Sequence, residues 1–161
     1  MDLPYFKILD KLPTPPQWLI DQIDVNERPD YEAFTPDATQ WLLDNVASNF
    51  NTENSGWVYF NQEQLPCNDL TKEWSLIFNV YPGGDDVELC FWQEPGQPIR
   101  RTDGYKTWDT TDGLDLLKRI KGPFDHWYIT HNTCIHSVRN MQGSQLNLQL
   151  NFDHGIIPSV L

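Results

Sequence analysis

The feature that most constrains the fold is a strict alternation of polar and apolar side chains near the end of the chain. In "QLNLQLNF", residues 145–152, four amide side chains alternate with three leucines and a phenylalanine. Successive side chains of a β-strand point to opposite faces of its sheet, so this segment predicts a strand with one polar and one apolar face. The polar row lies on a solvated outer face or lines a wet cavity. The apolar row needs a covering layer, and that requirement favours the cavity.

The covering layer is predicted in residues 1–50, where helical patterns dominate. One pattern runs over Gln17–Ile23, with Trp18, Leu19 and Ile23 on one face. A clearer helix starts at Thr35 and runs to Val46, with a hydroxyl cap, proline in the first position and an acid in the first turn. Its apolar side chains recur at helical spacing, so both helices are expected to pack on the leucine row.

From Gly56 to Phe152 the pattern is that of short strands separated by turns. The Pro-Gly-Gly segment after Tyr81 predicts a hairpin, residues 94–106 read as a long loop, and Asp112–Lys121 reads as a short helix. The segments with strand character are Trp57–Phe60, Trp74–Tyr81, Val87–Trp92, Trp127–Ile129 and the two that flank Gly143. Helices followed by short strands predict a mostly β fold, a sandwich or barrel with a helical layer on one side. With 161 residues, we expect a single domain, with a helical layer in 1–50 and a β core in 56–152.

Composition limits the partners. A formal net charge of -12, from 23 acidic and 11 basic residues, disfavours binding to nucleic acid or to an anionic membrane surface. Three cysteines without a CxxC pair indicate reduced thiols. The first residues lack the basic and apolar regions of a signal peptide, and no apolar run approaches the roughly 20 residues of a membrane span. These features predict a soluble, cytoplasmic protein.

Four motifs resemble a known family. The segments "PCND", "LTKEWSLIFNVYPGG", "FWQEPG" and "WYITHNTCIHSVRNMQG" are similar to the jelly-roll iron(II)/2-oxoglutarate oxygenases, especially the short versions carried by marine phages. The resemblance covers residues 56–152 and implies a double-stranded β-helix, the jelly-roll or cupin-like fold. In that family an H-x-D pair and a distant second histidine hold iron, which leaves three adjacent positions for a keto acid and dioxygen. Asp69 and His136 lie 67 positions apart, within the family's spacing.

The chain departs from the family pattern at two positions. Cys67 stands where the first histidine is expected, so the implied iron(II) ligands are Cys67, Asp69 and His136. Gln145 stands where the family carries the cation that binds 2-oxoglutarate, and with Asn147 on the same polar row it marks the implied cofactor position. A neutral amide cannot form the charge-assisted pair that arginine makes with a carboxylate, so 2-oxoglutarate is expected to bind poorly.

Structural roles compete with these assignments. Asp69 could cap a turn, and His136 could bond to a backbone carbonyl. His131 is expected to face away from His136, as is Arg139. The remaining candidates are His126 and His154 at solvated loop edges, Glu88 as an interior ligand, and Arg100 and Arg101 as carboxylate partners above the cavity mouth.

Three hypotheses follow from the sequence. The first is an iron-dependent oxygenase with an altered site. The second is a relative that has lost catalysis and serves as a binding or interaction module. The third is a structural or lectin-like jelly-roll component of a phage, an idea that rests on fold analogy. The substrate and the oligomeric state do not follow from the sequence under any of them.

Overall fold

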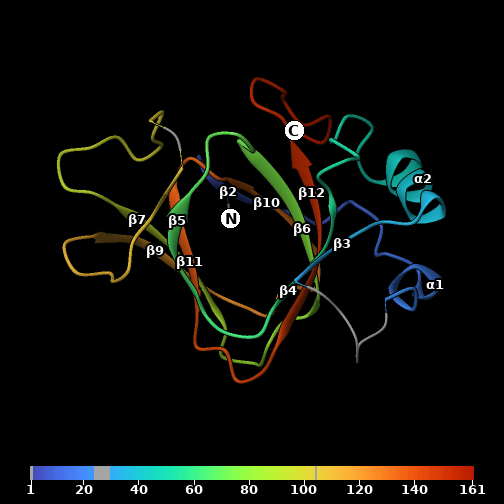
Figure 1. Cartoon of the computed structure of the whole chain (residues 1–161), viewed down its shortest axis with the longest axis horizontal. Helices are drawn as coiled ribbons and strands as arrows, with labels where there is room; N and C mark the ends of the chain where they lie inside the picture. The colour runs from blue at the N-terminus through green and yellow to red at the C-terminus, as the bar shows by residue number, and fades with distance from the viewer. Residues whose placement is uncertain (1, 24–29, 104) are drawn as a thin grey trace.

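The computed structural model describes residues 2–23, 30–103 and 105–161, and these form a mostly β protein of two antiparallel sheets that face each other (Figure 1). The seven-stranded sheet contains, in spatial order, β1 (Asp2–Leu3), β2 (Phe6–Leu9), β10 (Trp127–His131), β6 (Trp74–Tyr81), β12 (Gln145–Phe152), β4 (Gly56–Phe60) and β3 (Tyr31–Ala33). The five-stranded sheet contains β8 (Lys106–Thr107), β5 (Gln64–Asn68), β11 (Ile135–Arg139), β7 (Glu88–Gln93) and β9 (Asp115–Lys121). The predicted β-rich sandwich is therefore confirmed.

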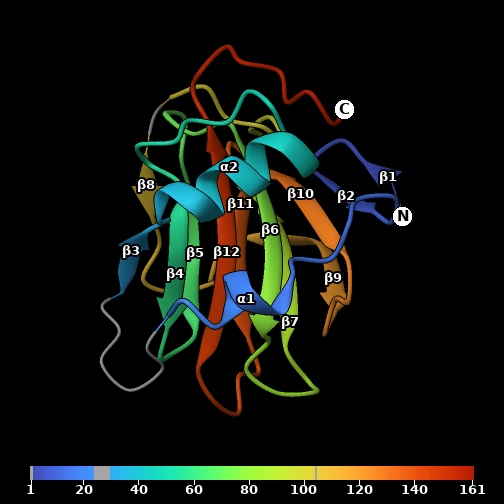
Figure 2. The same ribbon diagram turned by 90° about the vertical axis from the view of Figure 1, so that its right-hand side faces the viewer.

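Two helices, α1 (Gln17–Ile20) and α2 (Pro36–Asn45), lie on the outer face of the seven-stranded sheet (Figure 2). The apolar row of β12 packs against them: Leu148 and Leu150 have no exposed surface and share one core cluster with Leu19 and Leu42. Fully burying a leucine side chain stabilises a fold by about 1.5–3 kcal/mol. The predicted packing of helices on the leucine row is confirmed.

The longer helix begins as its sequence predicts. Thr35 Oγ1 accepts a hydrogen bond from the Ala38 backbone N–H at 3.2 Å, and Pro36 occupies the first turn. The shorter helix differs from the prediction, because it ends at Ile20 and leaves Trp18 45 % exposed. Leu19 is fully buried and Ile23 nearly so, but Trp18 does not lie on the buried face.

The first fifty residues also contain three strands that the helical reading missed. β2 pairs with β10, β1 pairs with β2, and β3 pairs with β4, so these strands extend both edges of the larger sheet. Each is only two to four residues long. A segment this short carries too few side chains to display a period, which is why only its pairing reveals it.

Residues 115–121 form β9, so the helix predicted over Asp112–Lys121 is wrong there. β9 pairs with β7, and their register shifts between Phe91 and Trp92, which pair with Lys118 and Leu116. Leu117 is the extra residue of this β-bulge. A bulge breaks the strict alternation of a strand, and the resulting spacing of Leu117 and Ile120 imitates a helical period.

The segment Pro82–Asp86 is a turn, as predicted, but it does not close a hairpin. β6 and β7 belong to different sheets, so the chain crosses from one sheet to the other here. Gly83 and Gly84 have φ of 90° and 128°, in the region that favours glycine. The Gly83 carbonyl accepts from the backbone N–H groups of Gln142 and Gly143, which bind this crossing to the one between β11 and β12. Turn residues indicate a reversal of the chain but not which sheet receives the next strand.

The contact between the sheets is aromatic at one end. Phe6 of the larger sheet meets Phe91 of the smaller one, with ring centroids 6.0 Å apart, and Tyr128 packs on Phe6 in the same cluster. Of the helices in the described part of the chain, the longer has ten residues, and neither is long and apolar enough to cross a membrane.

Candidate ligand-binding cavity

A cavity of about 410 Å³ lies between the two sheets. The polar row of β12 faces it, as the alternation in the sequence predicted. Side chains of β5, β7 and β11 line it from the opposite sheet, and residues of β3, β4, β6, β10 and the adjoining loops complete the wall. The lining residues used below are Tyr31, Asn54, Gln64, Cys67, Asp69, Lys72, Tyr105, Thr130, Asn132, His136, Gln145, Asn147, Gln149 and Asn151.

The amides of the polar row are held by one another. Asn79 Nδ2 donates to Asn147 Oδ1 at 2.5 Å, Asn147 Nδ2 donates to Gln145 Oε1 at 3.0 Å, and Gln145 Nε2 donates to the Pro82 carbonyl at 2.9 Å. Burying an amide without a partner costs free energy, and this chain of bonds offsets the cost for Gln145 and Asn147, both at most 4 % exposed. The result is a preformed polar wall.

A second group of bonds fixes the other end of the row. Asn151 Oδ1 accepts from Gln149 Nε2 at 3.0 Å and from Ser75 Oγ at 2.7 Å. Asn132 Nδ2 donates to the same Ser75 Oγ at 2.7 Å and to the Lys72 carbonyl at 2.6 Å. Asn132 is thus a site residue that the sequence analysis missed, because a single amide at the end of a strand carries no pattern.

Cys67 and His136 meet on neighbouring strands of the opposite wall. They are paired residues in the β5–β11 ladder, and Cys67 Sγ lies 3.8 Å from His136 Nε2. The other ring nitrogen, Nδ1, donates to the Cys134 carbonyl at 2.9 Å, which fixes the ring and directs Nε2 toward the thiol. Gln64 Nε2 also donates to Cys67 Sγ, at 3.4 Å.

Cys67 and His136 shift each other's pKa values in opposite directions. Burial alone would raise the pKa of Cys67, but the charge and hydrogen bond of His136 outweigh it, so the pKa is lowered. Burial alone would lower the pKa of His136, yet the Cys67 thiolate and the bond to the Cys134 carbonyl raise it. The two shifts favour a thiolate beside an imidazolium.

Asp69 lines the same cavity but is engaged locally. Its Oδ1 accepts from the Thr71 backbone N–H at 2.8 Å and from Thr71 Oγ1 at 2.7 Å, an arrangement typical of an aspartate that caps a turn. The structural roles considered from the sequence are therefore both present: Asp69 caps a turn, and His136 bonds to a backbone carbonyl. The same bonds leave Oδ2 of Asp69 for another partner and direct Nε2 of His136 to Cys67.

These donors fit an iron(II) site only in part. Cys67 Sγ and His136 Nε2 lie 3.8 Å apart and supply one sulfur and one nitrogen donor. Among the described residues, however, no three His, Cys, Asp or Glu side chains gather as a metal-binding group. The described residues therefore do not bring Asp69 together with Cys67 and His136 as the three ligands that the resemblance implies.

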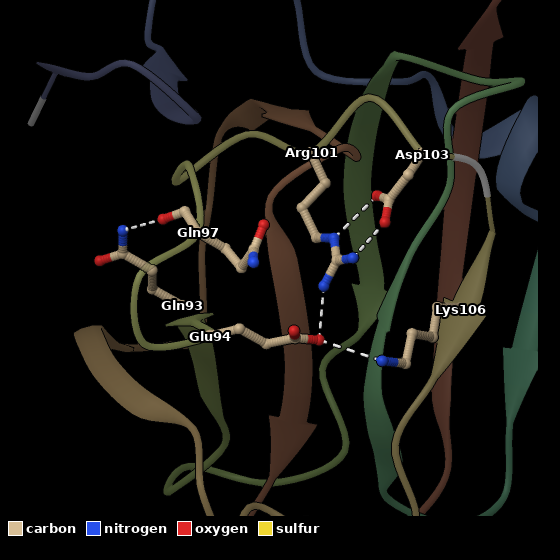
Figure 3. A network of polar contacts seen from close by, with 6 residues as sticks. All are labelled: Gln93, Glu94, Gln97, Arg101, Asp103 and Lys106. Atoms are coloured by element: carbon tan, nitrogen blue, oxygen red, sulfur yellow. Dashed lines mark hydrogen bonds and ion pairs between the residues drawn. The ribbon is translucent and has the colours of Figure 1, made fainter.

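The arginines of the long loop, Arg100 and Arg101, lie outside the lining of the cavity. Arg101 Nη1 lies 2.5 Å from Glu94 Oε1, and the same guanidinium binds both carboxylate oxygens of Asp103 (Figure 3). Lys106 joins the network through Glu94 at 3.2 Å. The backbone of Arg100 forms an isolated β-bridge with that of Cys134. Neither arginine lines the cavity, where Lys72 is the only lysine or arginine among the described lining residues.

Glu88 points away from the cavity, so the predicted interior role is wrong. Its neighbour Leu89 lies in the core between the sheets, whereas Glu88 bonds to Arg119 at 2.9 Å and lies 4.0 Å from Arg139. These groups border a hollow of about 650 Å³ on the outside of the five-stranded sheet. Arg139 accordingly faces away from His136, as predicted.

The three other histidines have structural surroundings. His131 belongs to β10, in the sheet opposite His136, and its Nδ1 bonds to Thr133 Oγ1 at 2.6 Å while its ring packs on Trp74. Burial lowers the pKa of His131 to about 4, with the positive charge of Arg100 adding to the effect and Glu73 opposing it. His126 and His154 are exposed and lie beside Asp125 and Glu73, as expected for loop-edge residues.

Comparison with known proteins does not assign the chain to a family. The chain matches no protein-family model, no curated protein and no solved structure. The functional argument therefore rests on the strand arrangement and on the cavity.

Proposed function

We propose that the sandwich is a double-stranded β-helix. Its eight core strands, in chain order, are β4, β5, β6, β7, β9, β10, β11 and β12. The first pairs with the eighth, the second with the seventh, the third with the sixth and the fourth with the fifth. A long hairpin folded at its centre and wound across two sheets makes these four pairs, and such winding defines the jelly roll.

We further propose that the protein is an oxygenase-like jelly roll that binds a small polar molecule in its cavity and has lost 2-oxoglutarate turnover. In this account Cys67 and Asp69 at the end of the second core strand, with His136 on the seventh, occupy the position of the iron ligands. The observation that carries the proposal is the wall opposite them. Where a cation would bind the keto acid, Gln145 donates its amide to the Pro82 carbonyl.

Charge supports the loss of keto-acid binding. 2-Oxoglutarate is a dianion, and the protein carries a formal net charge of -12. Losing a charge-assisted contact to a buried charge costs about 2–5 kcal/mol. That cost is equivalent to roughly 30- to several-thousand-fold in affinity. Cys67 and His136 are the residues that would hold an ion here, and a metal would supply Lewis acidity to a bound ligand.

The test is anaerobic calorimetric titration of 2-oxoglutarate in the presence of ferrous iron. The unmodified protein is expected to give no saturable heat and negligible succinate. Cys67→His with Gln145→Arg should restore keto-acid binding before any product chemistry. The single variant Gln145→Met is a matched control that removes the amide without adding a charge. Tight 2-oxoglutarate binding by the unmodified protein would overturn the proposal.

A further inference from the structure

The cavity wall combines apolar side chains with neutral groups that both donate and accept hydrogen bonds. Seven of its described lining residues are asparagine or glutamine, and Thr130 adds a hydroxyl. Asp69 and Lys72 are the only Asp, Glu, Lys or Arg side chains among the described lining residues. The amide row of such a wall selects ligands by hydrogen bonding.

The amides retain capacity for a ligand. A carboxamide has two N–H donors and an oxygen that can accept two bonds. The bonds among the described residues use one N–H of Asn147, to Gln145, and one N–H of Gln145, to Pro82. Each side chain keeps a second N–H and acceptor capacity. Hydroxyl groups match such a wall, because every hydroxyl is both a donor and an acceptor.

Two tyrosines add apolar ring surface to the lining of the same cavity. Tyr31 is 43 % exposed and Tyr105 is 69 % exposed, so both rings are accessible to a ligand. Tyr31 Oη donates to the Ser55 carbonyl at 3.1 Å, which holds that ring in place. Accessible rings beside a polar wall can pack on the C–H face of a ligand whose hydroxyls bond to the amides.

We propose that the ligand of this cavity is a neutral polyhydroxy molecule, a monosaccharide or a terminal sugar unit, with its hydroxyls on the amide row of β12 and its ring against Tyr31 and Tyr105. This inference rests on the proposed function, because it names the ligand class of the same cavity. A volume of about 410 Å³ lies within the usual range of small-molecule sites. The negative charge of the protein does not oppose an uncharged ligand.

The experiment is a titration of ¹⁵N-labelled protein with D-glucose, D-galactose and D-mannose, followed by nuclear magnetic resonance of the side-chain NH₂ groups. At least one sugar should shift the resonances of Gln145 and Asn147 saturably. The dissociation constant should be the same at low and high salt, because screening acts only on charges. Tyr105→Ala should weaken binding about three- to tenfold, the loss expected for one aromatic contact. Tyr81→Ala, a tyrosine 46 % exposed outside the cavity, should leave binding unchanged.

Titrations of the same samples with acetamide and with 2-oxoglutarate plus ferrous iron distinguish a failure of the sugar inference from a failure of the proposed function. Shifts of the cavity amides with acetamide but with no sugar would overturn the sugar and leave a polar-ligand cavity standing. Tight binding of 2-oxoglutarate would overturn the proposed function as well. Sugar binding that weakens equally in Tyr105→Ala and Tyr81→Ala would place the sugar elsewhere and also overturn the inference.

Discussion

At the scale of single residues, Cys67 differs from the other two cysteines. Cys90 and Cys134 have no exposed surface, whereas Cys67 is partly exposed and lines the cavity. Because His136 lowers the pKa of Cys67, more thiolate should be present at neutral pH than in an ordinary cysteine, and thiolate is the reactive form. In the presence of a chelator, iodoacetamide should modify Cys67 alone, with a pH–rate profile shifted to lower pH. His136→Gln should shift the profile back, and His126→Gln, at an exposed histidine, should not. Identical profiles in all three proteins would contradict this account.

His131 predicts a pH dependence of stability. Its pKa in the fold is about 4, below the usual value, so the unfolded chain binds a proton more readily than the folded one. Stability from the neutral ring is therefore present above about pH 6.5 and is lost as the pH falls toward 4. The loss from this residue has an upper limit of roughly 3 kcal/mol. Urea unfolding at pH 7 and pH 4.5 should show a smaller loss in His131→Gln than in the unmodified protein. An equal loss in both would assign the acid sensitivity to other groups.

At the scale of elements, β12 lies between the helices and the cavity. Its apolar face packs against α1 and α2, and its polar face lines the cavity. Leu148→Ala should leave a cavity beneath α1 and α2 and lower the free energy of unfolding by about 2–5 kcal/mol. Leu116→Ala, on the edge strand β9 where the side chain is 41 % exposed, should change it by no more than about 0.5 kcal/mol. Urea denaturation measures both. A loss at Leu116 as large as that at Leu148 would contradict the assignment of the β12 apolar face to the core.

The same element shows how much the sequence can predict. Alternation over eight residues of β12 predicted its two faces, and a capped helical period predicted α2, because long regular segments repeat their signal. The bulge at Leu117 broke the alternation of β9, so this strand was not predicted. The strands β1 to β3 are too short to show a period. Cys67, Asp69 and His136 were named through the family resemblance, and all three line the cavity, while their role as iron ligands stays a prediction. The Asn132 and Tyr31 contributions follow from pairings between distant strands, which no local pattern contains.

At the scale of the whole molecule, the pairing of eight core strands places the two sheets face to face, and each sheet contributes one wall of the cavity. The β5–β11 wall carries the thiol and imidazole, and the β12 wall carries neutral amides. Neither wall alone makes a site. The net negative charge of the protein and the amides of the β12 wall favour uncharged ligands. Under the proposed function, Gln145 in the β12 wall and the incomplete ligand set in the β5–β11 wall are the reasons why we expect no iron chemistry of the resembling family.

The most direct test of this account is a crystal structure of the protein grown anaerobically with ferrous iron and 2-oxoglutarate, with anomalous scattering recorded at the iron edge. We predict two sheets with the eight-strand pairing described above. We also predict no iron held jointly by Cys67, Asp69 and His136, with Asp69 still bonded to Thr71 and Gln145 to the Pro82 carbonyl. A fully occupied iron ion bound by all three side chains, with 2-oxoglutarate chelating it, would contradict the central claim.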